Sequence, residues 1–264
     1  MPPINVVING ALGKMGREMT NALCREPEIK IVGAVELKAT EDSLPLPDGS
    51  GKVPLSADLE AVLALCQADV LVDFSVAKAT MPAARIAAKH QVNLVIGTTG
   101  LTSDDIDEIG RLATTNKIGA VVAPNFALGA ILMMHLAKIA AKYLDYAEII
   151  ELHHHLKADA PSGTAIATAK AMSQSKGKPF SEPPSNAQAF PSRGDCVEGI
   201  TIHSVRLPGL MAHQEVILGT LGQTLSIRHD TINRECYVPG VLLAIKEVMK
   251  HQGLIFGLDA LLGL

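Results

Sequence analysis

The stretch Ile4-Asn-Val-Val-Ile-Asn-Gly-Ala-Leu-Gly-Lys-Met-Gly16 decides the fold of this chain. It begins with an apolar run typical of a buried strand, and an amphipathic helical pattern follows over Lys14–Arg25. Gly10, Gly13 and Gly16 stand at the junction. Glycines at this place let the backbone approach a pyrophosphate, which the amino end of the helix then faces. The stretch therefore predicts a dinucleotide-binding βαβ unit.

An acidic residue follows at the expected place. Glu36 ends the second apolar run, Ile29–Val35, where a carboxylate can accept hydrogen bonds from the adenine ribose hydroxyls. The spacing G-x-x-G-x-x-G differs from the commoner G-x-G-x-x-G, and a glycine triplet alone is equally compatible with a tight turn that binds nothing. The strand, the helix and Glu36 together favour a dinucleotide site.

The rest of the first half alternates short strands with helices, which is typical of right-handed βαβ units and a parallel sheet. We also expect a loop over Glu41–Pro54 and a helix capped by Ser56. The predicted strands are Ile4–Ile8, Ile29–Val35, Val70–Phe74, Asn93–Ile96 and Gly119–Ala123.

Two short segments follow predicted strands and fit the same cofactor. They are Gly97-Thr98-Thr99-Gly100 and Ala123-Pro124-Asn125-Phe126. Both lie at the carboxyl ends of parallel strands, where open α/β sheets bind ligands. Taken alone, each segment is better explained as an ordinary turn that binds nothing.

The pattern changes after Asn125. A helix over Leu128–Tyr143, a strand ending at His153 and a helix over Ser162–Ser175 are followed by a stretch without periodicity, 176–195, which we expect to be a functional loop or a mobile lid. Strand-like runs then predict a mostly antiparallel sheet, and a last helix is expected over Pro239–His251. The strand-like runs are Gly199–Arg206, Glu215–Leu218 and Thr224–Arg228.

The segment Glu151-Leu-His-His-His-Leu-Lys-Ala-Asp-Ala-Pro-Ser-Gly-Thr-Ala165 concentrates polar chemistry. Its three imidazoles lie at a strand end, and neighbours on a strand point to opposite faces. The three therefore cannot all bind one metal ion. With His203 and His213 as the remaining conceivable ligands, the spacing argues against a metal site.

The end of this segment predicts an anion cradle. The free N–H groups around Ser162, Gly163 and Thr164 and the Thr164 hydroxyl can bind a carboxylate, and Lys157 adds a full charge. We expect Asp159 to be buried nearby. A histidine beside such a cradle can serve as a general acid. The plainer alternative is a helix capped by Ser162.

Composition narrows the class of protein. The chain has 264 residues, of which 48% are hydrophobic, and a net charge of -4, which argues against a nucleic-acid partner. Its four cysteines form no C-x-x-C pair, and we expect reduced thiols in a cytoplasmic protein. We expect no signal peptide after Met1 and no bilayer-spanning segment, hence no membrane partner.

Over essentially its whole length, the sequence resembles the 4-hydroxy-tetrahydrodipicolinate reductase (dihydrodipicolinate reductase) family of bacterial lysine and diaminopimelate synthesis. The most specific motif is Glu151–Ala165. The others are Gly10–Gly16, Gly97–Gly100, Pro124–Phe126, Ile202–Gly209, Ala212–Glu215, Arg228–Asp230, Asn233–Glu235 and Val238–Gly240.

The resemblance implies roles for individual residues. His153 matches the proton donor and Lys157 the catalytic, carboxylate-contacting lysine. Substrate-binding positions are matched by His154, Ser162, Gly163 and Thr164. Positions lining the cofactor are matched by Gly10, Lys14, Met15, Glu36, Gly97, Thr99, Ala123 and Phe126. The chain departs from the family at His155, where many members have arginine, and at Leu156, where many have histidine.

The resemblance further implies a Rossmann-like dinucleotide-binding domain, residues 1–125 and 235–264, and an α+β domain, residues 126–234, for substrate binding and tetramerisation. The implied reaction is hydride transfer from NADH or NADPH to a small cyclic dicarboxylate, with His153 supplying the proton. Because Glu36 favours NADH while Lys14 and Lys38 can neutralise a 2′-phosphate, we expect use of both cofactors. A mostly antiparallel sheet with exposed edges also fits the homotetramer of that family.

Two other functions stay open. A semialdehyde dehydrogenase that forms an acyl-enzyme needs a nucleophilic cysteine, and none lies beside the histidine segment. A nucleotide sensor without activity could keep the fold, since fold alone does not prove catalysis. The pair His153 and Lys157 argues against that second alternative.

Overall fold

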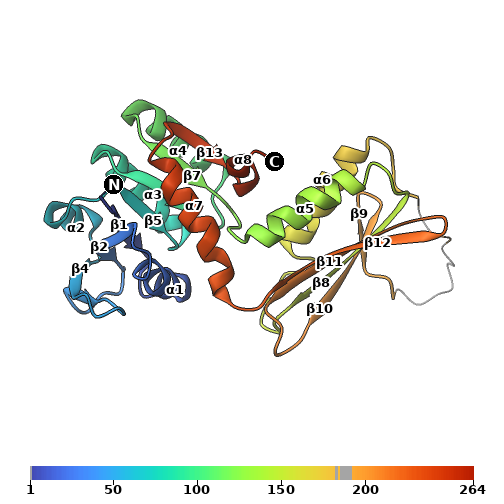
Figure 1. Ribbon diagram of the computed structural model, residues 1–264, viewed down its shortest axis with the longest axis horizontal. Coiled ribbons are helices and arrows are strands. Elements are labelled where there is room, and N and C mark those ends of the chain that lie inside the picture. The colour runs from blue at the N-terminus through green and yellow to red at the C-terminus, as the bar shows by residue number, and fades with distance from the viewer. Residues whose placement is uncertain (1, 182–183, 185–191) are drawn as a thin grey trace. The chain divides into compact units, whose positions relative to one another are not determined.

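The protein forms two compact units in the computed structural model, which describes residues 2–181, 184 and 192–264 (Figure 1). Unit 1 comprises Met1–Ala127 and Arg234–Leu264, and unit 2 comprises Leu128–Asn233. None of the helices in the described ranges is long and apolar enough to span a membrane. The expected functional loop at 176–195 lies in part outside the described residues.

Unit 1 is built on a sheet with the order β13-β7-β6-β5-β1-β2-β4-β3, eight strands within the described residues. The strands are β1 (Ile4–Asn9), β2 (Ile29–Val35), β3 (Ser43–Pro45), β4 (Lys52–Ser56), β5 (Val70–Asp73), β6 (Asn93–Ile96), β7 (Gly119–Val122) and β13 (Gly253–Phe256). All neighbours pair in parallel except β3 and β4. The chain order reverses between β1 and β5, which creates the switch point where such sheets bind ligands.

Helices cover both faces of this sheet, as the nearly continuous apolar runs of its central strands require. Helices α2, α3 and α4 form one layer, while α1 and α7 contact each other in the second. The helices are α1 (Lys14–Leu23), α2 (Leu59–Leu65), α3 (Ala77–Lys89), α4 (Ser103–Asn116), α7 (Val238–Val248) and α8 (Leu258–Leu262), and a 3-10 turn, η1 (Arg234–Tyr237), precedes α7. The expected parallel α/β architecture is therefore confirmed.

Two local predictions in unit 1 are wrong. The expected loop over Glu41–Pro54 contains the antiparallel pair β3 and β4. Prolines made this segment look irregular, yet an edge strand tolerates them, and burial of alternate side chains on β4 holds it against β2. The helix cap is Asp58 rather than Ser56: the Asp58 carboxylate accepts from the Glu60 amide at 2.9 Å, and Ser56 ends β4.

Unit 2 is a sheet with the order β12-β11-β8-β10-β9, five strands within the described residues. The strands are β8 (Tyr146–His153), β9 (Asp195–Val197), β10 (Ile200–Arg206), β11 (Ala212–Thr220) and β12 (Gln223–Thr231). Among the strand pairs of the described residues, only β8 with β10 is parallel, so the expected mostly antiparallel sheet is confirmed. Helices α5 (Leu128–Ala140) and α6 (Gly163–Lys176) pack on the sheet and on each other.

Side-chain alternation on β8 sorts its residues between the two faces of the sheet. Ala147 and Ile149 join a core cluster with buried side chains from α5 and α6, whereas their neighbours are partly or fully exposed. Glu151 and His153 continue the inward row to the carboxyl end of the strand. The core of unit 2 therefore turns polar at one end, and the polar cluster lies there.

Candidate functional site

The glycine loop follows β1 at the switch point of the unit 1 sheet. Gly10 has φ +81°, and a Cβ there would lie 2.8 Å from the carbonyl oxygen of Phe74. A Cβ on Gly16 would lie 2.1 Å from the carbonyl oxygen of Gly10. Side chains are thus excluded where the loop turns into α1. Gly13 and Lys14 are exposed and Met15 is half-buried, so the outer side of the loop is open to a ligand.

Glu36 braces this loop. One of its carboxylate oxygens, Oε2, accepts a hydrogen bond from the Leu12 amide at 3.1 Å, which joins the end of β2 to the glycine loop. Lys38, two residues further on, is exposed. The acidic residue identified from the sequence therefore has a structural contact as well as a position suited to ribose hydroxyls.

A buried carboxylate joins three strand ends beside the loop. Asp73 ends β5 and is 1% exposed. It accepts hydrogen bonds from Asn9 Nδ2 at 3.2 Å, from Ser75 Oγ at 2.6 Å and from Thr98 Oγ1 at 2.9 Å. Thr98, which we expected at the cofactor, is itself buried, so its side chain positions the loop from within.

The segments after β6 and β7 divide between core and surface. Phe126 is 2% exposed and packs edge-on against Phe74, with ring centroids 6.0 Å apart. A Cβ on Gly97 would collide with the same Phe74 ring. Ala123 is also buried, while the remaining predicted positions lie at the surface or partly so: Thr99 and Pro124 are exposed and Asn125 is half-buried.

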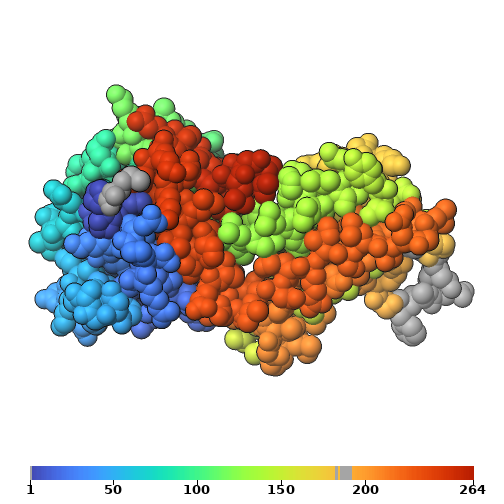
Figure 2. Space-filling model, viewed as in Figure 1, coloured from blue at the N-terminus to red at the C-terminus, as the bar shows by residue number. Residues whose placement is uncertain are grey.

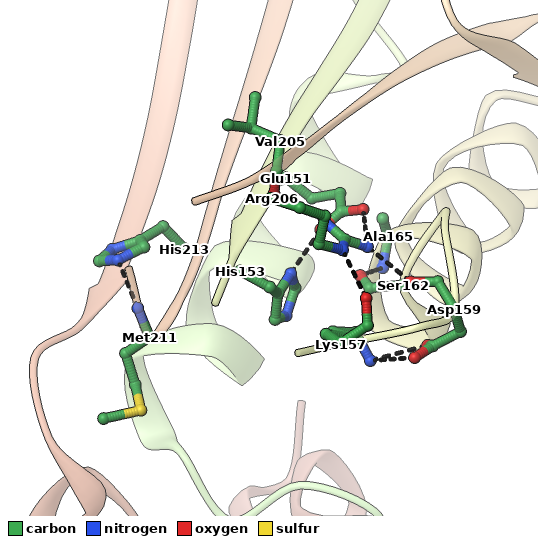
Figure 3. Close-up of polar contacts among 10 residues, drawn as sticks. All are labelled: Glu151, His153, Lys157, Asp159, Ser162, Ala165, Val205, Arg206, Met211 and His213. Atoms are coloured by element: carbon green, nitrogen blue, oxygen red, sulfur yellow. Dashed lines mark hydrogen bonds and ion pairs between the residues drawn. The ribbon is translucent and has the colours of Figure 1, made fainter. Parts of the chain in front are cut away.

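In unit 2, the Glu151 carboxylate is completely buried, and both of its oxygens are engaged (Figure 3). Arg206 on β10 binds it with two parallel hydrogen bonds, from Nη2 to Oε1 at 2.8 Å and from Nη1 to Oε2 at 2.9 Å. His153 Nδ1 is hydrogen-bonded to Oε2. Burial by itself raises the pKa of Glu151, but hydrogen bonds from His153, Arg206 and Ser204 outweigh it and lower the pKa to about 2. The carboxylate is therefore ionised at neutral pH.

Arg206 also fixes the loop that carries Lys157. Its Nε donates to the carbonyl oxygen of Lys157 at 3.2 Å, and its Nη2 donates to that of Asp159 at 2.6 Å. The Lys157 ammonium forms an ion pair with both Asp159 oxygens, at 2.8 and 2.7 Å. The expectation that Asp159 is buried is wrong: its side chain is 61% exposed, because an ionised carboxylate facing one lysine keeps its hydration.

Helix α6 begins beside this loop. Ser162 is buried, and its Oγ accepts from the Ala165 amide at 3.2 Å, so it caps the helix. Gly163 is exposed and a Cβ there would meet nothing within 4 Å, while Thr164 is half-buried. The first amides of a helix have no intrahelical acceptor. The cap and the anion cradle are therefore both compatible with the geometry of this helix start.

The other histidines of the segment lie apart from this cluster. His154 and His155 are exposed beyond the end of β8, and His213 on β11 is hydrogen-bonded to Asp230 at 2.7 Å. Within the described ranges, no group of three or more His, Cys, Asp or Glu side chains is arranged to hold a metal ion. The structure thus gathers His153, Lys157 and the start of α6 at one end of unit 2.

Unit 1 places a glycine loop, an acidic strand end and a helix start at the switch point of a parallel sheet, which defines the class of Rossmann-type dinucleotide-binding proteins. Family models agree over nearly the whole chain: residues 4–126 match "Dihydrodipicolinate reductase, N-terminus" and residues 129–262 match "Dihydrodipicolinate reductase, C-terminus". The chain belongs to the dihydrodipicolinate reductase family.

Individual relatives agree with this assignment. A 4-hydroxy-tetrahydrodipicolinate reductase of Dehalococcoides mccartyi is 58% identical over 100% of both chains. The enzyme of that name from Moorella thermoacetica is 48% identical over 98% of both chains. A solved dipicolinate-bound dihydrodipicolinate reductase from Paenisporosarcina sp. TG-14 has 37% identity and a TM-score of 0.86, covering 97% of this chain and 98% of that one.

The residues at the centre of these clusters, Asp73, Glu151 and Arg206, were not among the predicted site residues. Asp73 carried a usable signal, because it is the one acid in the apolar strand β5, and Glu151 carried a weaker one, because it alternates with the apolar residues Ala147 and Ile149 on β8. Arg206 lies 55 residues after Glu151, and only the parallel pairing of β10 with β8 brings the two together.

Proposed function

We propose that this protein reduces 4-hydroxy-tetrahydrodipicolinate to tetrahydrodipicolinate with NADH or NADPH, and that His153 and Lys157 carry the chemistry on the substrate. As a member of its family, the protein is a nucleotide-dependent reductase of lysine and diaminopimelate biosynthesis. The observation that carries the residue assignment is the polar end of the unit 2 core. A lysine, an open helix start and a histidine held by a buried acid lie together there.

A cyclic dicarboxylate needs two anion-binding groups. Lys157 supplies a full charge, and the ammonium can exchange Asp159 for a substrate carboxylate because the Asp159 side chain is exposed and is hydrated when released. The amides of Gly163 and Thr164 and the Thr164 hydroxyl supply neutral donors at a helix amino end, which favours anions. His154, just past the strand end, completes the proposed substrate residues.

His153 supplies the proton. Reduction of the conjugated imine places negative charge on a nitrogen or an enamine carbon, and an acid must neutralise it as water is lost overall. The ring of His153 stands at the end of β8 with a side chain only 15% exposed, fixed by Glu151 on one side. Of the three histidines in the segment, His153 is the one whose ring is held by a buried partner, whereas His154 and His155 are exposed.

The cofactor is assigned to unit 1. The glycines at 10, 13 and 16 let the loop turn tightly into α1, because a Cβ on any of them would crowd backbone atoms of Gly10 or Phe74, and this tight turn leaves the outer side of the loop open to a pyrophosphate. Glu36 is suited to the ribose hydroxyls, and the backbone of the segments 97–99 and 123–126 borders the same strand ends. When bound, the reduced nicotinamide supplies the hydride. We assign both NADH and NADPH, since Lys14 in the glycine loop and Lys38, two residues after Glu36, are exposed and can neutralise a 2′-phosphate.

A homotetramer is part of the proposal. Apolar side chains of unit 2 remain exposed on α5 and β12, which lie side by side at its surface (Figure 2). They are Leu132, Leu136, Ile139 and Leu225. Patches of this kind mark association surfaces. Light scattering at micromolar protein concentration should give the mass of a tetramer, and a monomer would contradict the assignment.

The decisive experiment follows oxidation of the reduced nicotinamide with freshly generated substrate. We expect turnover by the wild type and a fall of roughly 10²–10⁴-fold in kcat for His153→Gln, the usual contribution of a general acid. His155→Gln is the matched control, since it removes a neighbouring imidazole that is exposed and has no assigned role. Absence of turnover in the wild type refutes the activity, and equal rates in the two variants refute the role of His153.

A further inference from the structure

We infer that Glu151 is a positioning residue for the reaction: with Arg206 it fixes which nitrogen of His153 carries the deliverable proton. This inference rests on the proposed function, in which His153 is the proton donor. The two residues occupy i and i+2 on β8, so both side chains lie on the inward face of the sheet. Strand geometry alone therefore brings the carboxylate to the ring.

The hydrogen-bond inventory of Glu151 determines the tautomer. An ionised carboxylate can only accept hydrogen bonds, so a nitrogen that binds it must carry a proton. His153 Nδ1 is bound to Glu151 Oε2, and Nδ1 is therefore the donor. In the neutral ring the unprotonated nitrogen is then Nε2. When the ring takes up a proton, Nε2–H is the group left to deliver it, and among the described residues no hydrogen bond engages that nitrogen.

Arg206 makes the arrangement rigid. Its guanidinium binds both Glu151 oxygens in the bidentate geometry that such pairs favour, and Arg206 lies opposite His153 in the register of β10 and β8. The cation keeps the buried carboxylate ionised and prevents it from rotating away from the ring. Ser204 lies opposite Glu151 in the same register and also helps to lower the pKa of that carboxyl. The acid thus acts on the substrate only through His153.

The same strand offers a matched comparison. Glu148 also has a histidine and an arginine as partners, His203 at 2.8 Å and Arg193. It lies on the opposite face of β8, and its side chain is 39% exposed. Glu148→Gln therefore removes a carboxylate with the same kinds of partner, on the same strand, but away from His153.

The kinetic test is a double-mutant cycle on the intact protein. Glu151→Gln keeps the size of the side chain but can present an amide N–H to the ring, which favours the wrong tautomer. We expect kcat to fall on the order of 10²-fold with KM changed by less than about threefold, because a ring in the wrong tautomer cannot deliver its proton from Nε2, whereas the substrate carboxylates are bound by other groups. Glu148→Gln should retain wild-type kcat.

The cycle separates positioning from structural support. If Glu151 acts only through His153, Glu151→Gln should cost nothing further in a His153→Gln background, so the double variant should be as slow as the His153 variant alone. A further loss of tenfold or more in the double variant would overturn the inference. So would a normal kcat in Glu151→Gln while His153→Gln is slow. If His153→Gln itself turns over normally, the proposed function of His153 fails instead.

A measurement on the wild type keeps the inference testable even if Glu151→Gln fails to fold. In protein labelled with ¹⁵N-histidine, the ring nitrogens report the tautomer directly, and the His153 signals are those missing from His153→Gln. We expect the neutral ring to carry its proton on Nδ1. A proton on Nε2 would refute the inference whatever the variants do.

Discussion

Acid should weaken the β8 region by neutralising Glu151. The pKa of this carboxylate is lowered from 4.5 to about 2, so its stabilisation is present above the unfolded value and is lost as the pH falls through the folded value. At about 1.4 kcal/mol per pKa unit, the carboxylate contributes about 3 kcal/mol at neutral pH. By about pH 3, between the two pKa values, that contribution is down to about 1 kcal/mol.

Glu151→Gln mimics the protonated acid, so wild type and variant should converge at low pH. Hydrogen exchange of the β8 amides measures the free energy of opening at each pH. The free energy of opening should differ between the wild type and Glu151→Gln by about 3 kcal/mol at neutral pH and by about 1 kcal/mol near pH 3.

Glu108→Gln is the control for this measurement, followed on the α4 amides. Glu108 also faces an arginine through two hydrogen bonds, from Arg85 at 2.6 and 2.9 Å, but at the surface. The difference in the free energy of opening between the wild type and Glu108→Gln should be much smaller at every pH, because exposed ion pairs contribute little to stability. A difference for Glu151→Gln that stays constant from neutral pH to pH 3 would show that ionisation of Glu151 is not what stabilises β8.

Three further outcomes test the remaining residues. Lys157→Ala should lower kcat/KM on the order of 10²-fold while the cofactor Kd, measured by titration, stays unchanged; near-normal turnover would remove Lys157 from the site. Asp159→Asn should lower the substrate KM by about two- to fivefold, since the ammonium no longer has to leave an exposed partner; an increase would contradict the exchange. Wild-type KM values for NADH and NADPH should agree within roughly tenfold, and Lys14→Ala and Lys38→Ala should each weaken NADPH more; a hundredfold preference in the wild type would defeat dual use.

The sequence predicts the parallel sheet well because its signals are local. A buried apolar run leads directly into the glycine loop and an amphipathic helix, and each step depends on neighbouring residues only. The strand β13, Gly253–Phe256, escaped prediction because four residues are too few to show a period. The hairpin of β3 and β4 escaped because proline content suggests a loop unless the pairing partner is known.

The candidate site shows more clearly that contacts between residues far apart in the sequence cannot be predicted from local patterns. The sequence brings His153, Lys157 and Ser162 together because they share one segment. It does not reveal Arg206, whose contacts with Glu151 and with the 157–159 loop depend on the register of two strands. Nor does it reveal that Asp159 is exposed, because the direction of a loop side chain follows from the tertiary contacts of the loop.

For protein engineering, the brace between Glu36 and Leu12 determines where cofactor preference can be altered. The position that an engineer would first change to accept a 2′-phosphate, Glu36, also anchors the amide of Leu12 in the glycine loop. Its replacement would relax the loop that serves both nicotinamides, so affinity for the two would decline together. Lys38 is exposed and does not anchor the glycine loop. It is therefore the position to vary in libraries of variants, while Glu36 is kept constant.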